Sequence, residues 1–340
     1  MIANAIRKVL DRQHLERHEM AEVFGQLMDG KVTDVQKSAF LIGLRMKGET
    51  PDEITGAAMA MRDRVIPLEV DRPNLIDTCG TGGDGRGTFN ISTLAALVAA
   101  GAGASVAKHG NRAVSSSCGS ADVLSELGVA IDLDAGRMSE VLRRTGISFL
   151  FASKLHPAMG AVAGVRRELG VRTVFNVLGP LTNPAFARRQ VLGVYADHLV
   201  EVLASVLLAL GAEHAVVVHS RDGLDEISVS APTRVCEVCY GETRTYEITP
   251  EELGIARHPL EAVAGGDPGA NARIARAVLE GEEGARADIV AVNAGAALYV
   301  AGLAPSIRDG VVLAREALAD GRAIDKLHQL VTVSREMAAR

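Results

Sequence analysis

The chain is poor in several features that would decide its class at once. It has no tryptophan, an aromatic share of only 3% and a formal net charge of −6. A protein that holds nucleic acid through its phosphates needs an excess of positive charge, so this balance argues against such a binder. It still leaves room for a local basic pocket.

Long apolar runs are also missing. Residues 1–17 are charged and helical in pattern and lack the apolar centre of a secretory signal. The apolar stretch 94–106 is too short for a membrane span and is interrupted by glycine. We therefore expect a cytoplasmic protein with reduced cysteines and no membrane partner.

Cysteine is scarce, with four in the whole chain. Cys236 and Cys239 form a C-x-x-C motif within a segment that reads as a strand. A structural zinc site of this type needs a second pair of ligands, which the surrounding sequence lacks. We interpret the two cysteines as ordinary strand residues.

The features that are present predict two structural units. A length of 340 residues favours two domains. Apolar residues recur at helical spacing in 2–10, 21–28 and 35–46, and Thr33 and Thr50 mark helix starts. We expect residues 1–72 to form a small helical domain.

From residue 74 short apolar segments alternate with helical ones. Strands are expected at 74–80 and 104–108 and in ISFLFA, VLGVYA, AEHAVVVHS and DEISVS, with helices at 91–100 and 121–127. This alternation predicts an α/β fold in which a mostly parallel central sheet is covered on both faces. The α/β domain would span 73–340, and the segment of about 160–186 would return to the helical domain.

A glycine-rich loop, GTGGDGRGTFNIST (80–93), follows the first expected strand. Its glycines expose backbone N–H groups as an anion nest, and the helix capped by residues 90–93 adds its dipole. The loop contains G-x-G-x-x-G, but a dinucleotide site also needs an acid about 20 residues later, where this chain has Lys108. A P-loop would need G-K-[ST]. The loop therefore predicts a phosphate site of another kind.

A second polar loop, KHGNRAVSSSCGSAD (108–122), follows the next expected strand. The carboxyl ends of neighbouring parallel strands gather at one edge of a sheet, so the two loops should face each other. Two cations, an amide and a row of serines suit a pyrophosphate and a 5-phosphate. Ser120 fits equally well as the cap of the following helix.

These motifs resemble those of the anthranilate phosphoribosyltransferases, which share a wider fold with the class II nucleoside phosphorylases. The resemblance rests on GTGGD, NIST and KHGNRAVSS and continues through HPAM (156–159), VRRELGVRTVFNVLGPLTNP (165–184), GLDEIS (223–228), AGGD (264–267) and NAGAALYVAG (293–302). It implies a homodimer with its active site between the two domains. It also implies transfer of phosphoribosyl from phosphoribosyl pyrophosphate to anthranilate, in tryptophan biosynthesis.

The resemblance further implies roles at matching positions. Phosphoribosyl pyrophosphate would contact Gly80, Gly83, Asp84, Thr88, Asn90, Ile91, Ser92, Thr93, Lys108, His109, Gly110, Asn111, Arg112, Ala113, Val114, Ser115, Ser116 and Ser120. Anthranilate would meet Asn111 and Arg166, with Gly80 and His156 nearby, and Arg166 would bind its carboxylate. Mg²⁺ would be held by Ser92, Asp225 and Glu226, because this hard ion prefers carboxylates and substrate phosphate.

The chemistry requires little beyond positioning. In a loose, oxocarbenium-like transition state, orientation and leaving-group electrostatics can supply most of the rate. We expect no covalent intermediate and no indispensable general base, so no residue is named as certainly catalytic; His109 and His156 are candidates for proton handling. Two departures from relatives flank the acceptor pocket: Ser153 replaces a usual proline, and Gly160 replaces a frequent lysine.

Three alternatives remain at this point. A nucleoside phosphorylase of the same fold would use phosphate as its nucleophile, but GTGGD, NIST and Arg166 favour the transferase. A non-catalytic nucleic-acid binder is disfavoured by the net charge and the acid pair. An NAD-dependent oxidoreductase is disfavoured by the missing ribose-binding acid.

Overall fold

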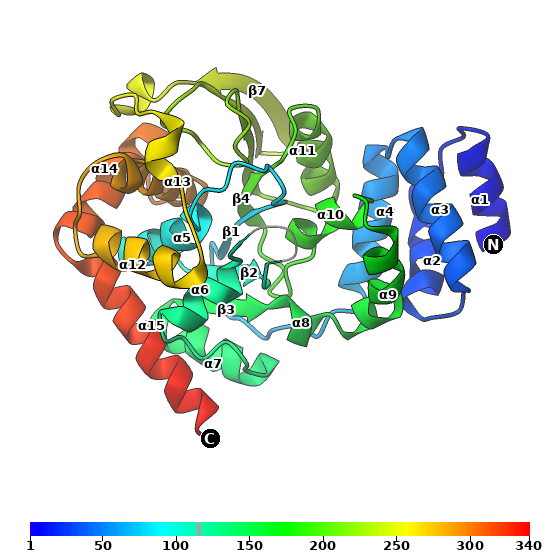
Figure 1. The fold of residues 1–340 in the computed structure, drawn as a ribbon, viewed down its shortest axis with the longest axis horizontal. Helices are drawn as coiled ribbons and strands as arrows, with labels where there is room; N and C mark the ends of the chain where they lie inside the picture. The colour runs from blue at the N-terminus through cyan, green and yellow to red at the C-terminus, as the bar shows by residue number, and fades with distance from the viewer. Residues whose placement is uncertain (114–116) are drawn as a thin grey trace.

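The computed structural model describes residues 1–113 and 117–340. In these residues a helical unit lies beside a larger α/β unit built on a seven-stranded sheet (Figure 1). The strands are β1 (Ile76–Gly80), β2 (Val106–Gly110), β3 (Ile147–Phe151), β4 (Arg189–Gly193), β5 (His214–Ser220), β6 (Thr233–Cys239) and β7 (Glu242–Ile248). None of the helices within the described ranges has both the length and the apolarity to cross a membrane.

The sheet is mostly parallel, as predicted. Its strand order is β3-β2-β1-β4-β5-β6-β7; the first five are parallel to their neighbours, and β6 and β7 add as antiparallel strands. β1 pairs with both β2 and β4, so it is central to the parallel part. The loops that leave β1, β2, β4 and β5 therefore meet at one edge of the sheet.

The N-terminal helices begin where capping residues predict. They are α1 (Ile2–Leu10), α2 (Arg17–Met28), α3 (Asp34–Lys47) and α4 (Pro51–Arg62). Thr33 accepts a hydrogen bond from the Gln36 N–H, and Thr50 accepts one from the Glu53 N–H, each as part of a capping box. Glu53 is also buried against Lys47 at 2.8 Å, which joins the end of α3 to the start of α4.

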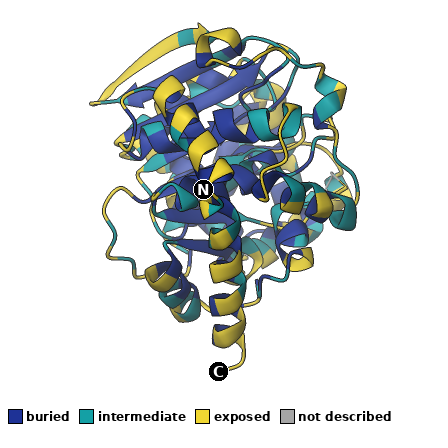
Figure 2. Cartoon of the chain, turned by 90° about the vertical axis from the view of Figure 1, so that its left-hand side faces the viewer, coloured by how far each residue is buried: buried dark blue, intermediate teal, exposed yellow. Residues whose placement is uncertain are grey.

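Both faces of the sheet are covered. The helices after β1 are α5 (Ile91–Gly101), α6 (Ser120–Glu126), α7 (Ala135–Thr145), α8 (Ala152–Leu155), α9 (Gly160–Leu169), α10 (Phe175–Leu178), α11 (Leu199–Ala209), α12 (Pro268–Leu279), α13 (Ala285–Val300), α14 (Ile307–Ala319) and α15 (Arg322–Ala338). Val216 and Val218 of β5 lie in the core shared with α5 and α13, whereas Ala215 and Val217 lie in the core shared with α11. The sheet strands are accordingly buried, and the edge strand β7 is largely exposed (Figure 2).

The segment after β3 leaves the sheet and reaches the helical unit. α9 packs against α2 and α3 (Figure 1). Val162 and Val165 of α9 share an apolar core with the N-terminal helices, and the Phe175 ring of α10 lies 5.2 Å from that of Phe24. α9 and α10 thus pack on the N-terminal helices although they lie far from them in the sequence.

One predicted strand is wrong. The segment DEISVS (225–230) forms a loop between β5 and β6. Its apolar residues Ile227 and Val229 are buried, which explains the strand-like alternation. However, the Ile227 N–H and C=O bond to the side chain of Asn293 on α13, at 3.0 and 2.9 Å, instead of to a neighbouring strand.

Candidate active site

The glycine loop crosses the carboxyl edge of the sheet between β1 and α5. Its turns rely on Gly82, Gly83, Gly85 and Gly87, whose φ angles lie between 64° and 79°, a region that glycine enters without steric cost. At the end of β1, a Cβ on Gly80 would lie 2.6 Å from Asp225 Oδ2. Glycine is therefore required where the loop turns and where β1 meets the acid pair.

Asp225 and Glu226 point into this edge from the loop after β5. The Gly82 N–H donates to Asp225 Oδ2 at 2.9 Å, and the Ser92 N–H donates to Glu226 Oε1 at 3.1 Å. Burial, with the nearby charge of Asp84, raises the pKa of Asp225 to about 7. Burial and the charge of Asp225 raise the pKa of Glu226 to about 8. The acid pair thus joins the glycine loop to the first turn of α5.

Asp84 adds a third carboxyl to this group. Its Oδ1 accepts a hydrogen bond from the Arg86 N–H at 3.1 Å, while its Oδ2 is buried and has no hydrogen-bond partner in the described part of the chain. Burying an unpaired carboxylate oxygen costs free energy, and neighbouring carboxylates resist ionising together. A divalent cation would relieve both effects. The donor set therefore fits Mg²⁺, which binds carboxylate oxygens.

Lys108 lies beneath the loops, inside the sheet. Its Nζ donates to the Thr78 carbonyl at 2.5 Å and lies 3.4 Å from Ser92 Oγ. Burial lowers its pKa, and the charges of Asp77 and Glu226 oppose that shift. Lys108 is thus a buried cation directed at the start of α5.

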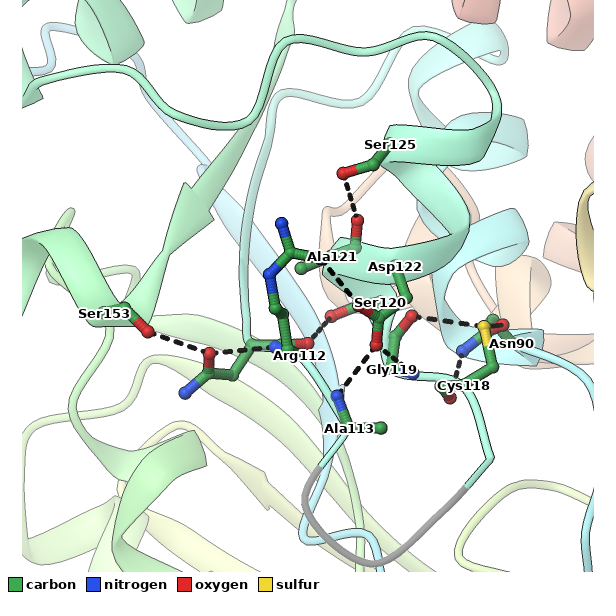
Figure 3. Close-up of polar contacts among 11 residues, drawn as sticks. Asn90, Arg112, Ala113, Cys118, Gly119, Ser120, Ala121, Asp122, Ser125 and Ser153 are labelled. Atoms are coloured by element: carbon green, nitrogen blue, oxygen red, sulfur yellow. Dashed lines mark hydrogen bonds and ion pairs between the residues drawn. The ribbon is translucent and has the colours of Figure 1, made fainter. Parts of the chain in front are cut away.

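One carboxylate ties the two ends of the second loop together (Figure 3). Asp122, in the first turn of α6, accepts hydrogen bonds from the N–H groups of Ala113 and Gly119, at 2.9 and 3.0 Å. It also pairs with Arg112 Nη1 at 2.8 Å. The loop is therefore anchored at its base. Val114, Ser115 and Ser116, which were predicted to contact phosphate, lie outside the described residues.

Asn90 and Ser120 do not cap their helices as predicted. α5 does begin after Asn90, but the Asn90 side chain donates to the Cys118 carbonyl at 3.1 Å and accepts from Asn271 Nδ2 at 3.0 Å. Ser120 is the first residue of α6, and its hydroxyl donates to the Asn111 carbonyl at 3.3 Å. Both side chains bind partners across the loops, which sequence spacing alone does not reveal.

The start of the second loop meets the segment after β3. His109 Nε2 lies 3.1 Å from His156 Nε2, and burial lowers the pKa of His109 to about 3 and that of His156 to about 4. Both rings are therefore neutral at pH 7. Asn111 Oδ1 accepts from Ser153 Oγ at 3.1 Å and from the Arg112 N–H at 2.8 Å (Figure 3). With its oxygen doubly occupied, the amide offers Nδ2 as a donor.

Arg166 approaches from α9, in the helical unit. Its guanidinium carbon lies 5.1 Å from the centre of the Phe175 ring. Burial lowers the pKa of Arg166, and no carboxylate in the described ranges forms an ion pair with it. A half-buried cation without an anion is a suitable partner for a small carboxylate. The two predicted anthranilate contacts come from separate elements, since Arg166 lies on α9 and Asn111 follows β2. No hydrogen bond within the described ranges joins them.

The other predicted loop residues differ in what they present. Thr88 is half-buried and forms an isolated antiparallel bridge with the AGGD segment. The side chains of Ile91 and Thr93 are buried in the core. Gly110 leaves space for the Ser120 hydroxyl and the Phe149 ring, which a Cβ would overlap.

Two groups near the site were missed in the sequence. Arg172 Nη1 donates to the Gly83 carbonyl at 3.4 Å, and its guanidinium lies 4.4 Å from the Tyr195 ring centre. Asp77 accepts from the His109 N–H at 3.1 Å and from Asn183 Nδ2 at 2.7 Å. Two features of the sequence could have identified these residues. Arg172 and Asn183 lie within the 165–184 motif, and Asp77 is an acid inside an otherwise apolar strand.

Comparisons with known proteins cover almost the whole chain. A family model described as "Glycosyl transferase family, a/b domain" matches residues 72–324. A second, described as the "helical bundle domain" of that family, matches residues 3–65.

Individual relatives agree with the family models. The anthranilate phosphoribosyltransferase of Anaeromyxobacter sp. (strain Fw109-5) is 56% identical over 335 residues, which cover 98% of this chain and 99% of that protein. The crystal structure of the Thermus thermophilus enzyme gives a TM-score of 0.92 at 50% identity, covering 97% of this chain and 99% of that one. The Saccharomyces cerevisiae enzyme in complex with PRPP and Mg gives 0.91 at 27% identity, covering 98% of each. The chain therefore belongs to the anthranilate phosphoribosyltransferase family.

Proposed function

We propose that this chain transfers the 5-phosphoribosyl group from phosphoribosyl pyrophosphate to anthranilate. The products are N-(5-phosphoribosyl)anthranilate and pyrophosphate, in tryptophan biosynthesis. The observation that carries this proposal is the carboxyl edge of the sheet, where the glycine loop, the start of α5 and convergent carboxyls are joined by hydrogen bonds. Family membership supplies the substrates and the requirement for Mg²⁺.

We assign phosphoribosyl pyrophosphate to the two loops at this edge. The glycine loop supplies backbone donors for phosphate oxygens, and the N-terminus of α5 adds a favourable dipole. The buried charge of Lys108 attracts the pyrophosphate from below. The proposed lining comprises Gly80, Gly83, Asp84, Thr88, Asn90, Ser92, Lys108, His109, Gly110, Asn111, Arg112, Ala113 and Ser120, with Val114, Ser115 and Ser116 proposed from the sequence alone. Ile91 and Thr93 lie behind this lining, because their side chains are buried in the core.

We assign Mg²⁺ to Ser92, Asp225 and Glu226. The unpartnered Oδ2 of Asp84 and the raised pKa values of the acid pair support a cation at this position. When bound, Mg²⁺ neutralises charge on the pyrophosphate and makes it a better leaving group. The Gly82 and Ser92 N–H groups orient the two carboxylates toward that position.

We assign anthranilate to the side of the cleft that carries Arg166 and Asn111. The unpaired guanidinium of Arg166 binds the carboxylate, and Asn111 offers its Nδ2 hydrogens. His109 and His156 border the amine as neutral rings. In the reaction the bond from C1 of the ribose to the pyrophosphate oxygen breaks, a bond from C1 to the amine nitrogen forms, and the nitrogen then loses one proton. A neutral histidine can accept this proton, although the released pyrophosphate and water can do so as well.

A direct assay tests the reaction. Anthranilate fluorescence is followed with purified protein, phosphoribosyl pyrophosphate and Mg²⁺, beside a sample with EDTA, and pyrophosphate release is measured in parallel. We expect Mg²⁺-dependent loss of fluorescence with one pyrophosphate released per anthranilate consumed. Binding of phosphoribosyl pyrophosphate without loss of anthranilate would contradict the assigned acceptor. Phosphorolysis of a nucleoside would indicate a phosphorylase instead.

We also propose that the protein is a cytoplasmic homodimer. Within each chain, residues 1–72 and about 160–186 would form the helical domain, and the rest of 73–340 would form the α/β domain, with the active site between them. Apolar side chains exposed on the helical unit support the dimer. Leu10 is 66% exposed, and Val35 and Met46 are 79% and 75% exposed on one face of α3. Light scattering should give twice the chain mass, and the double variant Val35→Glu/Met46→Glu should give the mass of a single chain.

A further inference from the structure

A cluster of polar side chains lies at the end of the sheet opposite the active site. His214 opens β5, while Glu237 and Cys239 close β6, and one possible ligand atom from each lies within 4.8 Å of the others. His214 is directly opposite Cys239 in the antiparallel ladder. Side chains alternate along a strand, so all three share the face of the sheet that packs on α13.

β5 separates this cluster from the acid pair. The strand runs from His214 to Ser220, and Asp225 follows its carboxyl end. At about 3.3 Å per residue, the strand is about 20 Å long. A ligand bound at the cluster would therefore not share groups with the proposed Mg²⁺ site.

The cluster is fixed by contacts within the chain. His214 Nε2 lies 3.0 Å from Glu237 Oε1, and the Tyr299 hydroxyl donates to the same oxygen at 2.6 Å. The imidazole stands edge-on to the Tyr299 ring, with 4.6 Å between ring centres. Because His214 and Glu237 are also buried, their ligand atoms are already in place for a shared ion.

We propose that His214, Glu237 and Cys239 form a site for one divalent cation of the zinc class. Imidazole nitrogen, thiolate and carboxylate are the donors that Zn²⁺ combines, and three protein ligands leave a fourth position for water. Mg²⁺ is a poor competitor because it requires oxygen ligands. On binding, Cys239 releases its thiol proton to solvent, and the cation replaces the hydrogen bond between His214 and Glu237.

The surrounding charges suit this complex. Arg244 Nη2 lies 3.5 Å from Glu237 Oε2. Burial and the charge of Glu237 raise the pKa of the Cys239 thiol, and the charge of Arg189 opposes that shift, so the bound cation itself must supply the charge that stabilises the thiolate. One divalent cation, one thiolate and one carboxylate sum to zero charge, so these arginines face a neutral complex. Relative to the empty site, whose charge of −1 comes from Glu237, binding adds one positive charge. Tyr299 continues to donate to Glu237 and orients it as a ligand, in the way that outer groups support metal sites.

Only one thiol of the C-x-x-C motif takes part. Cys236 lies with Val238 in the apolar core on the other face of the sheet. Residues three apart in a strand point to opposite faces, so the two thiols cannot share a ligand. Cys236 is therefore a matched control for Cys239, from the same strand and motif.

The test uses untagged full-length protein, freed of metal with EDTA and then dialysed into buffer that contains excess Mg²⁺. Co²⁺ is titrated as a spectroscopic probe, followed by Zn²⁺ in calorimetry. We expect one equivalent of each ion per chain and a thiolate-to-cobalt charge-transfer band. Cys236→Ser should retain the band, Cys239→Ser should lose it, and His214→Gln should weaken Zn²⁺ binding by at least about 10-fold.

Three results would overturn the site. These are the absence of a thiolate band in the wild-type protein, a band that persists in Cys239→Ser, or a band that is lost in Cys236→Ser while the protein remains folded. The wild-type spectrum decides the question even if a variant unfolds. Far-ultraviolet circular dichroism checks the fold of each variant. The test does not depend on enzyme activity, since the site lies apart from the proposed catalytic edge.

Discussion

The two sides of the proposed cleft are built in different ways. The phosphoribosyl side consists of loops at the ends of adjacent strands, where buried charges lie within hydrogen-bond range of backbone groups, as Asp225 does with Gly82. The anthranilate side combines the start of the second loop with α8 and α9, which pass from the sheet to the helical unit. Arg166 rests there on an aromatic ring and has no acidic partner within the described residues.

The phosphoribosyl side therefore carries the groups that act on the leaving pyrophosphate, and the other side carries the groups that recognise the acceptor. Sheet-edge loops are fixed by the strands on either side, which suits groups that must be placed accurately around a pyrophosphate. Short helices between two units can change a side chain without disturbing the sheet. Ser153 and Gly160, the two departures from relatives, both lie in or beside these helices.

The largest effect should come from the phosphoribosyl side, through Asp225→Asn. The amide can still accept from the Gly82 N–H, so the loop should keep its shape while the site loses a negative charge. We expect kcat/KM for phosphoribosyl pyrophosphate to fall by about 100- to 1,000-fold, because loss of metal-assisted charge neutralisation costs several kcal/mol in the transition state. Steady-state kinetics over a range of Mg²⁺ concentrations measures this.

The same variant should unfold at a higher temperature than the wild-type protein when Mg²⁺ is absent. Replacing a buried carboxyl removes its repulsion with Asp84 and Glu226. Lost activity together with raised thermal stability would distinguish a ligand role from simple damage. Activity within about threefold of wild type would remove Asp225 from the proposed Mg²⁺ site, because a metal ligand contributes far more to the transition state.

The next largest effect should come from the anthranilate side, through Arg166→Ala. Loss of a charged hydrogen-bond partner costs about 1.5–3 kcal/mol, so we expect KM for anthranilate to rise about 10- to 100-fold. KM for phosphoribosyl pyrophosphate should change little. The exposed neighbour Arg167→Ala is the matched control and should behave as wild type. Equal losses for both substrates would mean that the two sides do not act separately.

The same two sides show how far the sequence predicts the molecule. Strand and helix alternation predicted the parallel sheet, and the glycine loop was predicted as a phosphate site because glycines after a strand leave a local signature. The acid pair was singled out through the family resemblance, since adjacent acids alone are common on protein surfaces. Contacts between distant segments leave no local signature. The bond from Asn293 to Ile227 turned a predicted strand into a loop, and β7 was missed because its largely exposed, polar residues lack the apolar pattern of a buried strand.

A third effect concerns stability and pH. The pKa values of Asp225 and Glu226, about 7 and 8, lie above their ordinary values of 3.8 and 4.5. The folded chain then holds protons that the unfolded chain has released, so the free energy of unfolding should fall as pH rises from about 6.5 to 8. His109 and His156, whose pKa values are lowered on folding, add a smaller opposing rise at the low end of this window, because unfolded histidine is still about half protonated near pH 6.5. Above about pH 7.5 that rise has faded and the fall from the acid pair is left.

Mg²⁺ should abolish this pH dependence. Thermal melts at about pH 6.5 and 8 without Mg²⁺ should differ by at least about 2 °C, and the difference should shrink with excess Mg²⁺. The Asp225→Asn/Glu226→Gln double variant is the control and should show the smaller difference even without metal. A wild-type melting temperature that rises across this range would contradict the raised pKa values.

The smallest effect should come from Ser153→Ala, which tests the acceptor side alone. Ser153 Oγ donates to Asn111 Oδ1 at 3.1 Å and so favours the amide orientation that offers Nδ2 to anthranilate. Loss of one neutral hydrogen bond costs about 0.5–1.5 kcal/mol, so KM for anthranilate should rise about 2- to 10-fold with kcat unchanged. Ser153→Pro, the residue usual in relatives, should have the same effect, because the first turn of a helix accepts proline.

Ser125→Ala is the matched control: it removes a hydroxyl that donates to the Ala121 carbonyl within α6 (Figure 3) and should leave both KM values unchanged. If Ser153→Ala instead raised KM for phosphoribosyl pyrophosphate, Asn111 would belong to the phosphoribosyl side, and the boundary between the two sides would have to be redrawn through the second loop.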